Sequence, residues 1–109
     1  MIAFDDIDKA FNFLRDYADD AAKARAERLY LDEFSKSLKS IIMREHPLLA
    51  VNAQEREALA DERYLSHLKG LKQAIYEDEK IRYLMSAADT KCEVWRTMQA
   101  NERAIGKMV

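Results

Sequence analysis

Apolar residues recur at alternating steps of three and four positions between residues 3 and 42, and ten of these twelve positions are apolar. The positions are Ala3, Ile7, Ala10, Leu14, Tyr17, Ala21, Ala24, Arg28, Leu31, Ser35, Leu38 and Ile42. This spacing places the side chains in one stripe along a helix that favours a supercoil with a partner helix. Aspartates at 5, 6 and 8 favour a helix start nearby, and Pro47 disfavours helix before it, so we predict a helix over about 5–45.

A weaker repeat of the same kind lies in the second half of the chain, with eight apolar positions of twelve. The positions are Tyr64, His67, Leu71, Ala74, Asp78, Ile81, Met85, Ala88, Cys92, Trp95, Gln99 and Glu102. It predicts a second long helix over about residues 62–103. Gly70 is either a tolerated surface glycine or a point of close backbone contact, and Gly106 is expected to end the helix.

The connection between the two repeats, residues 46–52, is itself apolar. Its side chains Leu48, Leu49 and Val51 are therefore expected to tuck under the helix ends. Asn52 followed by Glu55 has the pattern of a reciprocal helix cap and predicts a short helix over about 53–60. Asp61 is expected to cap the long helix that follows.

Two long helices of similar length joined by a short connector should lie antiparallel. One register pairs Leu14 with Trp95 and brings Arg28 within one layer of Asp78. Two opposite charges buried near each other would compensate, whereas either alone would be costly. We therefore predict a buried ion pair between Arg28 and Asp78.

Further apolar side chains fall beside or off these two stripes and also need cover. They are Phe11, Phe13, Phe34, Ile41, Leu65, Leu68, Ile75, Tyr83 and Leu84. A second copy would cover them in a dimeric four-helix bundle, since symmetric homodimers are the commonest assembly. The alternative is that one apolar flank binds another protein. The prediction is one all-α domain, residues 1–109, that forms a homodimer.

The composition agrees with a helical protein and excludes several classes. Two glycines and one proline in 109 residues are few turn formers, and a net charge of −2 argues against a strongly basic nucleic-acid binder. The single Cys92 cannot form an internal disulfide, and no apolar run reaches the roughly 20 residues that span a bilayer. We expect a cytoplasmic protein without a signal peptide.

Catalytic and ligand-binding patterns are sparse. Two glycines leave no glycine-rich phosphate loop, and neither His46 nor His67 has a second metal-ligating residue four positions away. We expect His67 to be a hydrogen-bonded packing residue and Cys92 a small apolar one. The sequence therefore predicts no enzyme, no cofactor and no metal site.

Basic residues gather in the connector half of the predicted hairpin, whereas residues 5–20 hold six aspartates. Within this basic half, Lys36, Lys39 and Arg44 are the candidates for contact with nucleic-acid phosphates. Alternating lysine and glutamate that solvate a long helix are the simpler explanation. Nucleic acid is therefore the alternative partner and another protein the leading one.

Three stretches of the second half have a distinctive pattern. Residues 63–68 read RYLSHL, residues 81–84 read IRYL and residues 93–103 read EVWRTMQANER. In these residues, over about 53–103, the chain resembles a family of small helical proteins of tailed phages and prophages. The resemblance implies an early-region phage protein of unestablished activity, often encoded near recombination and single-strand-binding genes. It suggests docking onto recombination machinery or onto a host factor that the protein modulates.

The same resemblance selects four candidate partner-binding residues: Trp95, Arg96, Asn101 and Arg103. Core packing against Leu14 is the favoured alternative for Trp95. Helix capping and solvation are the alternative for Asn101 and Arg103.

Overall fold

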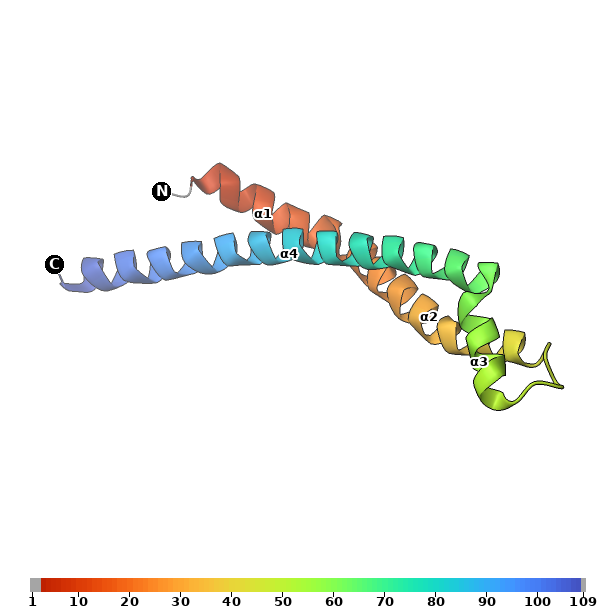
Figure 1. Cartoon of the computed structure of the whole chain (residues 1–109). Coiled ribbons are helices and arrows are strands. Elements are labelled where there is room, and N and C mark those ends of the chain that lie inside the picture. The colour runs from red at the N-terminus through yellow and green to blue at the C-terminus, as the bar shows by residue number, and fades with distance from the viewer. Residues whose placement is uncertain (1–2, 109) are drawn as a thin grey trace. The chain divides into compact units, whose positions relative to one another are not determined.

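The computed structural model describes residues 3–108, which form four helices and no strand. They are α1 (Phe4–Asp16), α2 (Ala18–Met43), α3 (Val51–Ala60) and α4 (Glu62–Met108) (Figure 1). The predicted all-α class is confirmed. The helices divide into two units: unit 1 holds residues 3–21 and 80–108, and unit 2 holds Ala22–Glu79. Helices α2 and α4 each contribute to both units.

The first apolar repeat folds as two helices, where one uninterrupted helix was predicted. Tyr17 lies in a turn between α1 and α2, with φ of −102° and ψ of 5°. Its N–H donates to the Phe13 carbonyl at 3.0 Å, and its carbonyl accepts from the Ala21 N–H at 2.9 Å. Asp19 and Asp20 occupy the first turn of α2, where the helix dipole favours carboxylates. The acidic run thus supports a second helix start within the repeat.

The second long helix extends further than predicted. Helix α4 continues through Gly106 to Met108, because neither glycine adopts the positive φ that usually ends a helix. A Cβ atom added at Gly70 would meet no atom within 4 Å. Gly70 is therefore a surface glycine and not a point of close backbone contact.

The connector differs from its prediction in burial and in capping. Leu48 is 99% exposed, and Leu49 and Val51 are exposed as well, so these side chains do not tuck under the helix ends. The prediction of a cap at Asn52 is wrong, because α3 begins at Val51 and its first residues have no side-chain cap. Gln54 instead anchors the connector from within α3.

That anchor is a pair of hydrogen bonds from one amide. Gln54 Nε2 donates to the carbonyl oxygens of His46 and Leu49, at 2.9 and 3.0 Å. Both carbonyls lie in the connection between two helices, and the His46 carbonyl also accepts from the Leu49 N–H at 3.1 Å, so the amide adds to the hydrogen bonds that hold the chain reversal. At the other end of α3, the predicted cap by Asp61 is confirmed: the Arg63 N–H donates to Asp61 Oδ1 at 2.8 Å.

Unit 1 packs α1 and the first residues of α2 against the C-terminal part of α4. Its core contains Ala10, Ala88 and the fully buried Cys92, with Phe13 and Leu14 packed around them. In Figure 1 the N-terminus of α1 and the C-terminus of α4 lie at the same end of this unit. The two helices are thus antiparallel.

Unit 2 packs the rest of α2 against α3 and the first part of α4. Arg28 contacts Asp78, and Ser35 contacts His67, so the partner number falls on α4 as it rises on α2. The two helices therefore run antiparallel in this unit too. Its buried apolar side chains are Ile42, Ala58 and Ala74.

Candidate interaction surfaces

Trp95, the first of the four candidates from the phage resemblance, is a packing residue of unit 1. Its ring lies edge-on to Phe11, with ring centroids 6.4 Å apart and an interplanar angle of 88°. Leu14, the expected partner, packs on the cluster around Cys92 in the same unit. Arg96 lies with its guanidinium carbon 5.7 Å from the centre of the Phe11 ring and forms an ion pair with Glu93. Trp95 and Arg96 thus both contact Phe11.

The remaining two candidates are exposed in the last stretch of α4. Helix α4 continues to Met108, so neither Asn101 nor Arg103 lies at a helix end where it could act as a cap. Within residues 3–108, no hydrogen bond or ion pair joins either side chain to Trp95 or Arg96. The structure therefore does not gather the four candidates into one site.

The three candidates for phosphate contact have different environments. Lys36 forms an ion pair with Glu33 at 3.2 Å, and Lys39 forms a short ion pair with Glu55 of α3. Arg44 is exposed and lines an open hollow of about 430 Å³ beside Pro47. Two of the three positive charges are therefore already matched by carboxylates.

The structure brings the predicted pair Arg28 and Asp78 together inside unit 2. Arg28 Nη1 lies 3.1 Å from Asp78 Oδ2 and 2.7 Å from Glu79 Oε1. Asp78 is only 4% exposed, so its charge depends on this contact. Hydrogen bonds to Glu79 and then to Asp78 raise the pKa of Arg28, which keeps the guanidinium protonated. The sequence had not assigned Glu79 to this contact.

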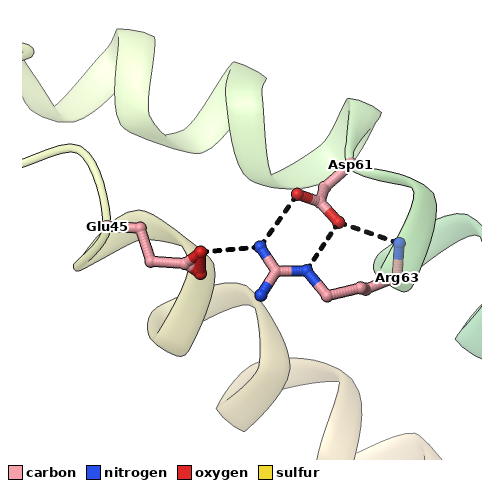
Figure 2. Close-up of polar contacts among 3 residues, drawn as sticks. All are labelled: Glu45, Asp61 and Arg63. Atoms are coloured by element: carbon pink, nitrogen blue, oxygen red, sulfur yellow. Dashed lines mark hydrogen bonds and ion pairs between the residues drawn. The ribbon is translucent and has the colours of Figure 1, made fainter.

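A second charge cluster ties the start of α4 to the turn that follows α2 (Figure 2). Arg63 Nη2 donates to Glu45 Oε1 at 2.8 Å and to Asp61 Oδ2 at 3.0 Å, while its Nε donates to Asp61 Oδ1 at 3.0 Å. The side-chain hydrogen bond from Arg63 lowers the pKa of both carboxyls, and the Arg63 backbone N–H adds to the effect at Asp61. This cluster clamps the connector and was missed, because Glu45 is 18 residues away in sequence.

His67 is a hydrogen-bonded packing residue, as expected. Its Nε2 lies 2.7 Å from Ser35 Oγ, and its ring centre lies 5.4 Å from that of Phe34. The described residues gather no three histidine, cysteine or acidic side chains that could hold a metal ion. No helix within residues 3–108 is long and apolar enough to cross a membrane.

Seven of the nine apolar side chains predicted to need cover are exposed. They are Phe11, Ile41, Leu65, Leu68, Ile75, Tyr83 and Leu84. Three of them lie on α4 of unit 2, on a side that also carries exposed lysines. We name the exposed side chains of Leu65, Leu68, Lys69, Lys72 and Tyr76 the lysine face. The steps of three, four and seven between them place all five on one side of α4.

Comparison with known proteins adds no relative. The sequence matches no protein-family model, no curated protein and no solved structure. The resemblance to small phage proteins therefore depends on the residues quoted for it.

Proposed function

We propose that this chain is a non-enzymatic, phage-type interaction module that docks a helical face onto a partner protein. Recombination machinery, or a host factor that the protein modulates, is the proposed class of partner. The observation that supports docking is the row of exposed apolar side chains on α4, among them Leu65 and Leu68. Contiguous exposed apolar surface is typical of interaction sites.

We also propose that the chain forms a homodimer, which would cover part of the exposed apolar surface. A dimer would bury some exposed apolar side chains against a second copy, as in a four-helix bundle. Phe11, Tyr83 and Leu84 belong to unit 1, whereas the lysine face belongs to unit 2, so self-association through unit 1 would not require the residues proposed for docking.

The alternative function is that of a nucleic-acid-binding accessory factor. Arg44, Lys69 and Lys72 favour it, because all three are exposed and none forms an ion pair with a described residue. Such binding should weaken steeply with salt, since it releases counterions from the phosphates.

A photo-crosslinking experiment tests the leading proposal. A crosslinking amino acid is placed at Leu68, or at the exposed Ser66 as a control, and the purified chain is irradiated in a bacterial extract with and without nuclease treatment. A protein adduct specific to Leu68 should be identified by mass spectrometry, and the purified partner should bind the chain in isolation. Leu68→Ser should weaken that binding more than Lys36→Ala/Lys39→Ala does. Adducts only to nucleic acid would contradict the proposal.

A further inference from the structure

We infer that the lysine face of α4 binds an acidic amphipathic helix of the partner protein. The inference rests on the proposed function, because it names the surface and the chemistry of the protein that would dock there. Two features of the face carry it: exposed apolar side chains at helical spacing, and positive charge without any negative charge among them.

The apolar part of the face fits a helix. Leu65, Leu68 and Tyr76 are exposed and recur at steps of three and eight residues along one side of α4. A helix laid across another helix contributes side chains at steps of three, four and seven, so it can cover such a row. An extended strand would gain less, because a helix surface offers no free backbone groups for strand pairing.

The charged part of the face indicates that the partner's surface is negatively charged. Between Glu62 and Glu77 the chain holds no acidic residue, although 35% of all its residues are charged. Lys69 and Lys72 lie in this stretch and have no carboxylate partner among residues 3–108. Together with Gln73 and Tyr76 they line an open hollow of about 550 Å³. Carboxylates on both sides of an apolar stripe would match this arrangement.

A second copy of the chain fits the face poorly. A two-fold contact centred on it would place Lys69 and Lys72 against the same lysines of the other copy. Like charges brought together across an interface are destabilising, and burial would strengthen that repulsion.

Nucleic acid also fits the face less well than an acidic helix. Two lysines neutralise few phosphates, whereas binding to a nucleic-acid backbone commonly uses about 6–10 such contacts. A phosphate backbone would also leave Leu65 and Leu68 uncovered. Tyr76 could stack on a base, but one aromatic ring gives a small part of such an interface.

The test measures binding of the full-length chain to labelled synthetic helices by fluorescence anisotropy. The first peptide is longer than about 15 residues, so that it is helical, and carries a leucine stripe flanked by glutamates. The second replaces each glutamate by glutamine, and the third has the composition of the first in scrambled order. A thymidine oligonucleotide is the fourth probe. We expect the first peptide to bind at least about tenfold more tightly than the other three.

The variants locate the binding. Lys69→Glu/Lys72→Glu should weaken binding of the acidic peptide by about tenfold or more. The control Lys107→Glu also reverses a lysine charge on α4, within unit 1, and should leave the affinity unchanged. Leu65→Ser should weaken the acidic and the glutamine peptide alike. Circular dichroism verifies that each variant is folded. If Leu65→Ser does not fold, the Lys69→Glu/Lys72→Glu variant, which changes exposed residues, still tests whether the face binds the acidic peptide.

Other results would overturn the inference in distinguishable ways. Equal affinity for the acidic and glutamine peptides, or no loss in the lysine variant, would remove the charge argument. If Ile41→Ser weakened peptide binding and Leu65→Ser did not, the proposed docking onto proteins would stand, but its site would lie on α2. Binding of the oligonucleotide alone would contradict both this inference and the proposed function. A chain that self-associates only with intact lysines would assign the face to a second copy.

Discussion

Ser35 Oγ lies 2.7 Å from His67 Nε2 and joins α2 to α4 within unit 2. The same hydroxyl lies 3.2 Å from the Leu31 carbonyl oxygen, one turn earlier in α2. A hydroxyl has a single proton, so Ser35 can donate to Leu31 while His67 Nε2–H donates to Ser35. In this arrangement Nε2 of His67 carries a proton, and the contact holds the ring beside Phe34.

Removing the Ser35 hydroxyl should destabilise the protein. Ser35→Ala leaves the half-buried His67 Nε2 without its partner, and a lost hydrogen bond of this kind costs about 1 kcal/mol of unfolding free energy. Urea unfolding followed by circular dichroism measures the loss. Ser37→Ala changes an exposed serine of the same helix and serves as the control. Equal stability of the two variants would show that the hydrogen bond adds nothing.

Truncating Arg28 should be more damaging than truncating an exposed arginine. Arg28→Leu removes the cation that compensates Asp78, which is almost fully buried, and an uncompensated buried charge is strongly destabilising. Arg56→Leu in α3 is the matched control, because Arg56 is exposed. The double variant Arg28→Leu/Asp78→Leu should regain much of the lost Tm, since it removes the buried Asp78 carboxylate together with its cation. A Tm of Arg28→Leu equal to that of Arg56→Leu would refute a stabilising role for the pair.

The Arg63 cluster should make stability depend on pH in acid. Hydrogen bonds from Arg63 hold the pKa of Glu45 and Asp61 below their usual values of 4.5 and 3.8. Because both pKa values are lower in the folded state, the stabilisation is complete above the unfolded values and is lost as the pH falls through the folded ones. The free-energy difference between wild type and Arg63→Gln should thus stay constant above about pH 5 and shrink below 4.5.

Unfolding in urea at a series of pH values measures that difference. Lys107→Gln removes an exposed charge that forms no ion pair within residues 3–108 and should show no such change. A difference between wild type and Arg63→Gln that is as large in strong acid as at neutral pH would mean that the cluster does not act through its carboxylates.

Trp95 should report on the packing of unit 1. It is the only tryptophan, and its ring packs edge-on against the ring of Phe11. Phe11→Ala should expose the indole to water and shift its emission to longer wavelength, whereas Phe4→Ala, at a residue already 76% exposed, should not. If Phe11→Ala left the emission unchanged, the indole would be packed by other residues.

The repeats in the sequence predicted the helices well but not their continuity. A seven-residue spacing predicts which side chains lie on the same side of a helix, and Arg28 and Asp78 form the contact that the antiparallel register predicted. It does not register a single residue such as Tyr17 that leaves helical geometry while its hydrogen bonds persist. Gly106 was read as a helix end, yet glycine stops a helix reliably only when it adopts positive φ.

Burial in the connector and the contacts of the candidate residues could not be predicted from the sequence. The apolar side chains of Leu48 and Val51 suggested burial. Burial also requires another part of the protein to pack against them, and both side chains are exposed. The bonds from Arg63 to Glu45 and from Lys39 to Glu55 cross between helices and carry no spacing signal. Asn101, which was chosen by resemblance, has no hydrogen bond or ion pair within residues 3–108 that joins it to Trp95.

The mass in solution should be twice the 12.7 kDa of one chain. Unit 1 has an open hollow of about 300 Å³ whose apolar lining includes Phe13 and Leu84, and whose charged lining includes Asp6 and Lys91. A two-fold contact there would cover the apolar side chains and set the aspartate of each copy near the lysine of the other.

Light scattering at low and high salt measures the mass, on protein free of nucleic acid. Because apolar burial would hold the dimer, high salt should leave it intact, and Leu84→Glu should give the monomer while Lys107→Glu stays dimeric. A wild-type monomer at both salt concentrations would contradict the dimer. The exposed side chains of both units would then all remain open to another protein, and docking would become the sole account of the apolar surface.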